Sequence, residues 1–189
     1  MRKIKIEQST PEWLSWRRTC VTASEAAIIL GVSPYCDLDT LRKRKLGLLE
    51  EEPCNQWMQH GRDTEPIARD YFNKHYTDLN FLPAVVESSE YPFLGASLDG
   101  ISTCGNKLLE IKCGKSSHKL AVKGVIPPHY IAQIQHQLLV TGAEICCYFS
   151  FDVDHQVIIE VVPDKDWQVD YIPKAEAFWM SLIFPDTNL

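Results

Sequence analysis

Three short β-rich runs lie close together in the middle of the chain and constrain its fold more than any other feature. They cover residues 81–87, 94–98 and 107–112. Tyr-Pro, Asp-Gly and Cys-Gly-Asn turn signals separate them. Short strands joined by such turns predict an antiparallel meander over residues 81–112.

Helical patterns flank this meander on both sides. The predicted helices cover residues 10–18, 24–31, 39–46, 55–76, 128–140 and 164–182, and two further strands are predicted at 145–151 and 157–162. Pro66 is expected to bend the long helix or to begin a new one, because it lacks an amide donor. No repeat or flexible linker divides the chain, so we expect one domain over residues 1–189, an α/β sandwich with a mixed sheet.

The net charge of −6 argues against a nucleic-acid partner, but its distribution along the chain is uneven. Residues 1–48 and 106–123 each carry a net charge of +4, whereas residues 49–105 and 124–189 each carry −7. The alternative interpretation is ordinary charge scatter on a soluble surface. If a polyanion binds, we expect the two acidic blocks to lie away from its path.

Other class signals indicate an intracellular, cytoplasmic protein with no membrane partner. No apolar run of about 18 residues exists, and the first residues lack the apolar core of a signal peptide. The number of cysteines is odd and none has C-x-x-C spacing, so we expect reduced thiols and no iron–sulfur cluster. They are Cys20, Cys36, Cys54, Cys104, Cys113, Cys146 and Cys147.

The stretch that carries chemistry joins Asp99 to Glu110-Ile111-Lys112. Glu110 and Lys112 share one face of a strand while Ile111 points to the other. If Asp99 lies beside them, two carboxylates and the Ile111 carbonyl form a set of hard oxygen ligands suited to Mg²⁺. Lys112 could then position or help to deprotonate a nucleophilic water, and Glu65 is a candidate third carboxylate. The alternative is a turn aspartate with a surface Glu–Lys pair on an edge strand.

The chain resembles the lambda-exonuclease-like (YqaJ-like) phage-type recombination exonucleases of the PD-(D/E)XK nuclease superfamily. The resemblance rests on five blocks that occur in one order over about residues 13–151. The blocks are Trp16-Arg17 with Val21-Thr22-Ala23-Ser24, Gly61 to Glu65, Ser97-Leu98-Asp99-Gly100, Leu109-Glu110-Ile111-Lys112-Cys113, and Tyr130-Ile131-Ala132-Gln133-Ile134-Gln135. This implies a restriction-endonuclease-like core, a central mixed β-sheet flanked by helices.

The resemblance also implies roles for the residues at matching positions. Asp99 and Glu110, with the carbonyl of Ile111, resemble the metal ligands, and Mg²⁺ is the implied metal, with Mn²⁺ as a substitute. Lys112 resembles the catalytic lysine. Glu65 resembles the helical acidic residue that completes the site, and Gln133 the glutamine that orients the nucleophilic water or the lysine. Arg17 and Ser24 match the pair that holds the 5′-phosphate of a DNA end.

Two basic segments are candidate contacts to the DNA backbone. The run Arg42-Lys43-Arg44-Lys45 could follow phosphates or form the solvated face of a short helix. Lys115 and Lys119, with Lys123, form a cationic stripe if residues 116–123 are helical. A stripe beside a nuclease centre favours phosphate contact.

These features together predict a Mg²⁺-dependent 5′-to-3′ double-stranded DNA exonuclease of bacterial, phage or viral origin. It would leave 3′ overhangs for a single-strand annealing partner in homologous recombination. The resemblance also implies a ring-shaped homotrimer around duplex DNA. The alternatives are a structure-specific or restriction-like endonuclease on the same core, and a non-catalytic DNA-binding module.

Overall fold

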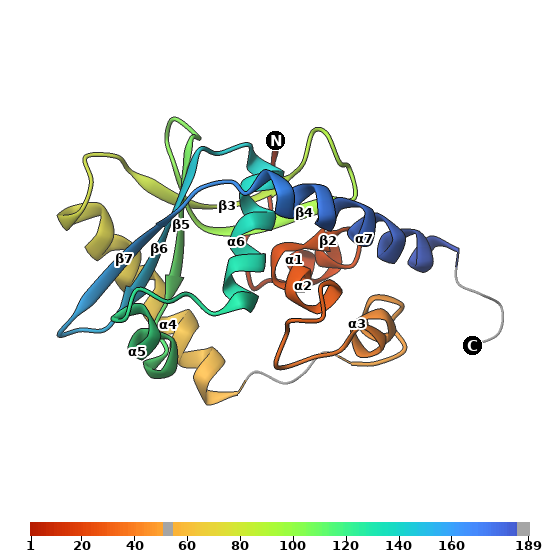
Figure 1. The fold of residues 1–189 in the computed structure, drawn as a ribbon, viewed down its shortest axis with the longest axis horizontal. Coiled ribbons are helices and arrows are strands. Elements are labelled where there is room, and N and C mark those ends of the chain that lie inside the picture. The colour runs from red at the N-terminus through yellow and green to blue at the C-terminus, as the bar shows by residue number, and fades with distance from the viewer. Residues whose placement is uncertain (51–54, 185–189) are drawn as a thin grey trace.

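The computed structural model describes residues 1–50 and 55–184 (Figure 1). The helices are α1 (Pro11–Arg17), α2 (Ala23–Ile29), α3 (Leu38–Lys45), α4 (Gln56–His75), α5 (Lys115–Ala121), α6 (Pro128–Thr141) and α7 (Lys165–Ile183). The strands are β1 (Arg2–Ile4), β2 (Val21–Thr22), β3 (Phe81–Glu87), β4 (Leu94–Ser102), β5 (Lys107–Lys112), β6 (Ile145–Phe151) and β7 (Gln156–Val161).

The strands form one mixed sheet in the order β1-β3-β4-β5-β6-β7, and β2 pairs with β4 outside this path. The β3–β4 and β4–β5 pairs are antiparallel, which confirms the predicted meander. The β5–β6 pair is parallel and β6–β7 is antiparallel. The short strands β1 and β2 were not predicted, because three and two residues carry no usable periodicity.

Helices cover both faces of this sheet. On one face, α6 and α2 pack against a cluster that includes Leu108, Ile134 and Leu138. On the other face, α4 contributes Ala68 and Phe72 to a second cluster. Alternate residues of β5 therefore enter different layers: Leu108 belongs to the first cluster, and Leu109 and Ile111 to the second.

Strand β4 is longer than the sequence predicts. The Asp-Gly signal at residues 99 and 100 indicated a turn, but both residues lie inside β4, which continues to Ser102. Gly100 is packed so closely that a Cβ atom there would lie 3.1 Å from side-chain atoms of both Phe81 and Leu109. Glycine at this position reflects close packing within the sheet rather than a turn.

The long helix α4 excludes one of the two outcomes expected for Pro66. It is one helix that contains Pro66, so no new helix begins there. Proline is tolerated when the lost hydrogen bond is offset by packing, and Ala68 and Phe72 in the next turns are buried in the core. Asn55 begins the helix by accepting hydrogen bonds from the amides of Trp57 and Met58 at 3.0 Å.

No helix among the described residues is long and apolar enough to cross a membrane. No disulfide joins the cysteines that the structure describes, and Cys20, Cys146 and Cys147 are buried. Cys54 lies outside the described residues.

Candidate active site

The pairing of β4 with β5 brings Asp99 beside Glu110. The backbone pairing of β4 with β5 ends at Gly100 and Leu109, next to Asp99 and Glu110. Beyond it, the Asp99 carboxylate replaces the backbone partner, because its Oδ2 accepts a hydrogen bond from the amide of Ile111 at 2.8 Å. Asp99 is therefore held in place by the neighbouring strand.

Glu110 is 1% exposed and both of its carboxylate oxygens are engaged. Oε1 accepts hydrogen bonds from Gln133 at 2.8 Å and from Lys112. Oε2 accepts a hydrogen bond from Gln137 at 2.6 Å. The two glutamines stand one turn apart on α6, so a single helix face fixes the orientation of the carboxylate. The edge-strand alternative for this Glu–Lys pair is wrong, since β5 lies between β4 and β6.

Lys112 stands between carboxylates and an aromatic ring. Its ammonium lies 4.7 Å from the centroid of the Tyr130 ring. Burial opposes the charge of Lys112, but the carboxylates of Glu110 and Asp99 outweigh it and raise the pKa of the lysine above its usual range. In this arrangement Lys112 is a hydrogen-bond donor and a fixed positive charge rather than a proton acceptor.

Helix α4 adds Glu65 and a residue that the motifs did not indicate, Arg69. The Arg69 Nη1 donates to Glu65 Oε1 at 3.0 Å and also to the main-chain carbonyl of Asp99. Arg69 therefore fastens α4 to the strand that carries the first carboxylate. Its four-residue spacing from Glu65 was a signal for the pair, but nothing in the sequence indicated the contact with β4.

The three carboxylates repel one another at this end of the sheet. Burial, followed by the charges of Glu110 and Glu65, raises the pKa of Asp99 well above its usual value. Burial also raises the pKa of Glu65, with Arg69 acting in the opposite direction. A divalent cation would relieve this repulsion.

The donor set fits a hard cation at Asp99 and Glu110. Two carboxylates and the Ile111 carbonyl supply oxygen ligands of the kind that Mg²⁺ prefers. Within residues 1–50 and 55–184, no group of three or more His, Cys, Asp or Glu side chains is close enough to hold a metal ion by itself. Glu65 lies near enough for its charge to raise the pKa of Asp99, but its carboxylate is paired with Arg69 at 3.0 Å.

Arg17 and Ser24, the proposed 5′-phosphate pair, lie together. The Arg17 Nη2 donates to Ser24 Oγ at 3.1 Å, and its guanidinium stacks 4.7 Å from the Trp13 ring centroid. Ser24 is exposed and is the second residue of α2 rather than the residue before the helix. That place belongs to Thr22, whose amide donates to Glu25 at 2.8 Å. The guanidinium also pairs with the Glu25 carboxylate at 3.7 Å, so an anion at this place would share Arg17 with Glu25.

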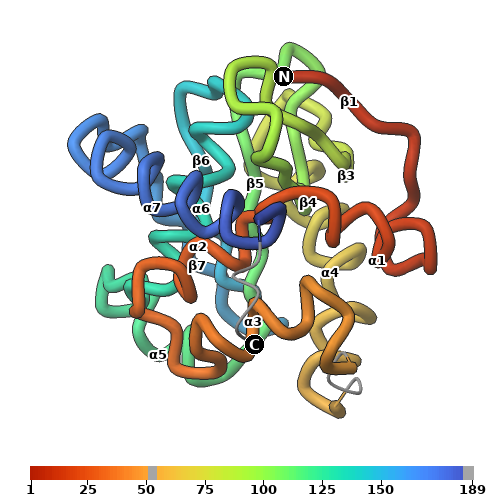
Figure 2. The backbone as a smooth tube through the Cα atoms, turned by 90° about the vertical axis from the view of Figure 1, so that its right-hand side faces the viewer, coloured from red at the N-terminus to blue at the C-terminus, as the bar shows by residue number. Residues whose placement is uncertain are grey.

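The basic run on α3 does not form one cationic face. The prediction that Lys45 contacts the DNA backbone is wrong. Its side chain is 4% exposed and pairs with Glu25 at 2.8 Å, so it cannot reach a DNA backbone. Arg42 donates to the carbonyl of Ser181 at 3.0 Å, which joins α3 to the end of α7. Figure 2 shows the backbone of both helices on the side of the molecule that faces the viewer. Arg44 lies 3.8 Å from the Cys36 sulfur. Lys43 is half-exposed and pairs with Asp39 of the same helix at 2.6 Å.

The second basic segment forms a helix as expected. Lys115 and Lys119 are exposed, one turn apart on α5. Lys123 is also exposed and follows the end of that helix. Because α5 begins soon after β5, this stripe lies directly downstream of Lys112 in the chain.

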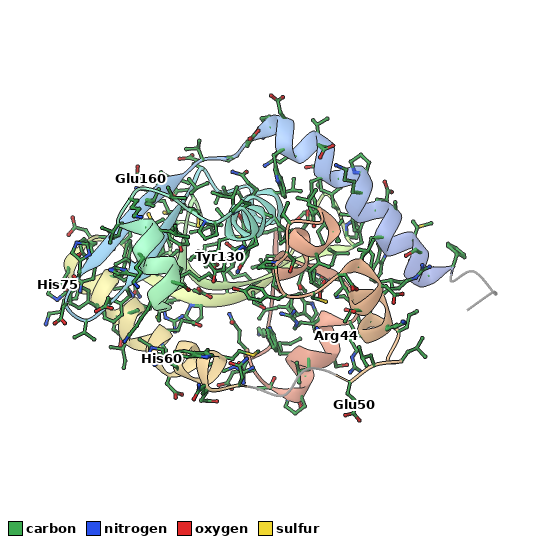
Figure 3. The ribbon with its side chains drawn as sticks, turned by 60° about the horizontal axis from the view of Figure 1, so that its bottom comes forward. Arg44, Glu50, His60, His75, Tyr130 and Glu160 are labelled. Carbon is green, nitrogen blue, oxygen red and sulfur yellow. The ribbon has the colours of Figure 1, made fainter. Side chains whose placement is uncertain are left out.

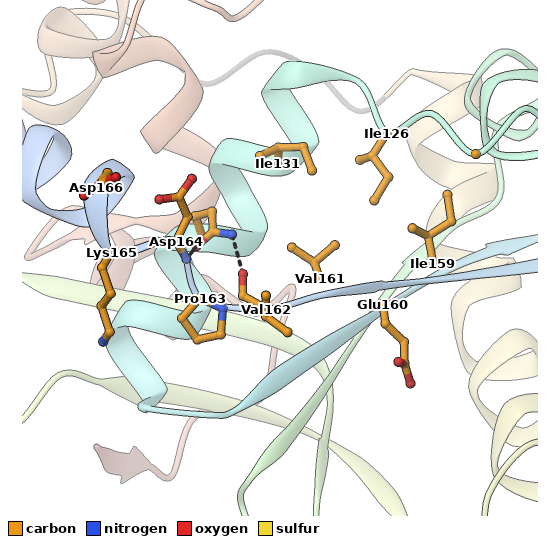
Figure 4. Close-up of a pocket in the computed structure, with 12 residues that line it drawn as sticks. Ile126, Ile131, Ile159, Glu160, Val161, Val162, Pro163, Asp164, Lys165 and Asp166 are labelled. Carbon is orange, nitrogen blue, oxygen red and sulfur yellow. Dashed lines mark hydrogen bonds between the residues drawn. The ribbon is translucent and has the colours of Figure 1, made fainter.

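A cavity of about 650 Å³ lies elsewhere, between α6, β7 and the start of α7 (Figure 4). Ile126, Ile131 and Ile159 line it, with carboxylates at Glu160, Asp164 and Asp166. None of the candidate site residues lines this cavity. In Figure 3, Glu160 and Arg44 lie on opposite sides of the molecule, so this acidic segment is well separated from the basic helix α3.

Comparison with known sequences identifies relatives. The family model of the YqaJ-like viral recombinase domain matches residues 12–144. The uncharacterized protein YqaJ of Bacillus subtilis (strain 168) is 29% identical over 179 residues, 92% of this chain. The uncharacterized protein R354 of Acanthamoeba polyphaga mimivirus is 27% identical over 164 residues, 79% of this chain. The chain spans 56% and 30% of the lengths of these two proteins.

Solved structures share the fold. An alkaline exonuclease (LHK-Exo) from Laribacter hongkongensis has a TM-score of 0.79 and 26% identity, covering 92% of this chain and 93% of that chain. LHK-Exo in complex with dAMP has a TM-score of 0.78 and 24% identity, with the same coverage. A phage-related exonuclease from Haemophilus somnus 129PT has a TM-score of 0.61 and 15% identity, covering 90% and 97%. The expected restriction-endonuclease-like fold is confirmed, and by its family match the chain belongs to the YqaJ-like viral recombinase domain family.

Proposed function

We propose that this chain is a Mg²⁺-dependent deoxyribonuclease that digests duplex DNA from its 5′ ends and leaves 3′ single-stranded overhangs. The observation that carries the proposal is the convergence of Asp99, Glu110 and Lys112 at one end of the β4–β5 pair. Membership of a recombinase family and a fold shared with alkaline exonucleases support the same activity.

Asp99 and Glu110, with the main-chain carbonyl of Ile111, would hold the metal. A bound Mg²⁺ supplies a Lewis acid that polarises a phosphate and lowers the pKa of water. Lys112, held by Glu110 and Tyr130, donates hydrogen bonds and offers positive charge to a phosphate oxygen. Gln133 donates one amide hydrogen to Glu110 and has a second one for an attacking water or a phosphate oxygen.

Arg17 and Ser24 are suited to a terminal 5′-phosphate. An arginine can make a bidentate contact with a phosphate, and a serine hydroxyl adds a further donor. Stacking on Trp13 holds the guanidinium in place. Lys115 and Lys119 are free on the surface of α5 to contact the strand backbone.

The test is digestion of duplex DNA carrying a label at one end, with Mg²⁺ or with EDTA. We expect nucleotides to be released from 5′-phosphorylated ends in Mg²⁺ and no digestion in EDTA or by Lys112→Ala and Asp99→Ala. Exonuclease activity that survives both substitutions would refute the assigned site. The exposed substitution Lys174→Ala on α7 is the matched control and should retain full activity.

A covalently closed circular duplex separates the end-dependent activity from an endonuclease, because it should remain intact. DNA binding without hydrolysis would instead favour a non-catalytic module. Three predictions remain: the homotrimer ring, the annealing partner and the single nuclease domain over residues 1–189. Size determination of the purified protein would test the trimer, and capture of a bound protein would test the partner.

A further inference from the structure

Three aromatic rings connect the lysine of the candidate site to the protein surface. The Lys112 ammonium lies 4.7 Å from the Tyr130 ring centroid. The Tyr130 centroid lies 4.2 Å from that of His129, which in turn lies 5.6 Å from that of Tyr35. The first contact is a cation–π contact, and the ring pairs are close enough to be packed against each other. The row therefore begins at α6 beside the catalytic strand and ends in the loop between α2 and α3.

The outer ring of this row is open to solvent. Tyr35 is 75% exposed, more than any other Phe, Trp or Tyr side chain that the structure describes. An aromatic ring in that position gains little from burial and keeps its surface free for a ligand.

The loop that presents this ring is held by its own hydrogen bonds. The amides of Tyr35 and Cys36 donate to Ser33 Oγ at 3.2 and 3.4 Å. The Tyr35 ring meets the His129 ring at 85°, an edge-to-face contact that limits its rotation. The Tyr35 ring is therefore held in one orientation before a ligand binds. Binding of a flat ligand then costs little side-chain conformational entropy.

The surroundings favour a nucleobase as that ligand. Burial and the charge of Lys112 lower the pKa of His129, which favours the uncharged form of its ring in this row. The row starts at Lys112 of the candidate site, and the loop that carries Tyr35 follows α2, whose second residue is Ser24. Alternation of cationic groups with an exposed aromatic ring is the pattern of surfaces that bind single-stranded nucleic acid.

We propose that Tyr35 stacks on a nucleobase of the DNA strand whose phosphate is cleaved beside Lys112, with His129 and Tyr130 supporting its ring. This inference rests on the proposed function, since it requires a DNA strand in the candidate site. Tyr35 is thus a binding residue for the base, independent of base identity, because every base has a π face.

The experiment uses a 5′-phosphorylated duplex. The strand that is digested carries 2-aminopurine at the three positions nearest its 5′ end. Wild type, Tyr35→Ala, Tyr35→Trp and Val32→Ala are compared for binding in Ca²⁺ and for digestion in Mg²⁺. Val32 is the matched control because it is an exposed side chain without a π system in the same loop, at 42% exposure. Circular dichroism checks that each variant is folded.

We expect Tyr35→Ala to weaken binding on the order of 5- to 150-fold, the range for loss of one base–aromatic stack, and to change the 2-aminopurine fluorescence of the complex. Tyr35→Trp and Val32→Ala should behave like wild type. If Tyr35→Ala binds and digests like wild type with unchanged fluorescence, the inference is overturned while the nuclease assignment stands. Equal losses in Tyr35→Ala and Tyr35→Trp would overturn stacking. Absence of digestion by wild type would instead refute the proposed function, and this inference with it.

Discussion

Gln137 donates a hydrogen bond to Oε2 of Glu110 at 2.6 Å, and both side chains are about 1% exposed. This contact leaves the other carboxylate oxygen, Oε1, for Lys112 and Gln133. The block that resembles the family ends at Gln135 and does not include Gln137. The structure adds Gln137 as a residue that sets the rotation of the carboxylate.

Replacing Gln137 by Met should reduce the rate of DNA digestion by about 10- to 100-fold, because hydrogen-bond partners of metal-binding carboxylates have effects of that size. The measurement is the initial rate on end-labelled duplex. Gln135→Met is the control, since Gln135 is equally buried on α6 but bonds Val162 and Asp164 instead. Comparable rate losses in the two variants would contradict the positioning role.

Asp99→Asn should abolish digestion yet stabilise the protein in EDTA. The folded-state pKa of Asp99 is raised, mainly by burial, so its charged form opposes folding at neutral pH. The destabilisation by the charged Asp99 carboxylate becomes smaller as the pH falls through the pKa of Asp99 in the folded protein. The measurement is the urea midpoint of both proteins at pH 8, with the exposed Asp70→Asn as control. A lower midpoint for Asp99→Asn would contradict the electrostatic argument.

Lys45→Met should destabilise the protein by about 3 kcal/mol, because it removes the nearer of the two cations that pair with the buried Glu25 carboxylate and leaves Arg17 at 3.7 Å. Lys43→Met, on the same helix, removes only a solvent-exposed pair with Asp39 and should change the stability far less. Urea unfolding monitored by tryptophan fluorescence measures both. Equal stabilities would mean that the Lys45–Glu25 pair contributes nothing.

The buried residue His136 should make stability depend on pH. Its Nε2 donates to the Gly95 carbonyl at 2.9 Å and its Nδ1 accepts from the Tyr171 hydroxyl at 2.7 Å. Burial lowers the pKa of His136 from 6.5 to about 4. Between these values the unfolded chain binds a proton that the folded protein does not, so stability falls as the pH falls. The loss is about 2 kcal/mol from pH 7 to pH 5.

The check on this pH dependence is urea unfolding of wild type and His136→Gln at both pH values. The variant should lose the His136 contribution, whereas the exposed His60→Gln should keep it. A variant whose pH dependence matches that of wild type would show that another group is responsible.

Gly95→Ala should destabilise the protein by about 1–3 kcal/mol through overpacking. A Cβ atom at this position would lie 2.7 Å from the Trp16 ring and 2.8 Å from the Cys20 sulfur. Gly61 lies inside α4, and a Cβ atom at this position would have no atom from outside the helix within 4 Å, so Gly61→Ala causes no overpacking. That substitution should stabilise by about 0.5–1 kcal/mol. Thermal unfolding measures both, and a stable Gly95→Ala protein would contradict the close packing.

Much of the candidate site could be predicted because its signals are local. The two-residue period of β5 determines that Glu110 and Lys112 share a face while Ile111 points to the other layer. The seven-residue separation of Arg17 and Ser24 spans a single connection between α1 and α2, and the two side chains meet at 3.1 Å. The same short-range patterns predicted the meander, the order of the helices and the mixed sheet.

The tertiary structure alone decided the remaining features. The sequence shows four adjacent basic residues on α3, but only packing against Glu25 of α2 decides that Lys45 is buried. Likewise, the contact of Arg69 with the Asp99 carbonyl joins residues 30 positions apart. Local periodicity determines which face a side chain occupies. The partner it meets there depends on how distant elements pack, and no local pattern encodes that arrangement.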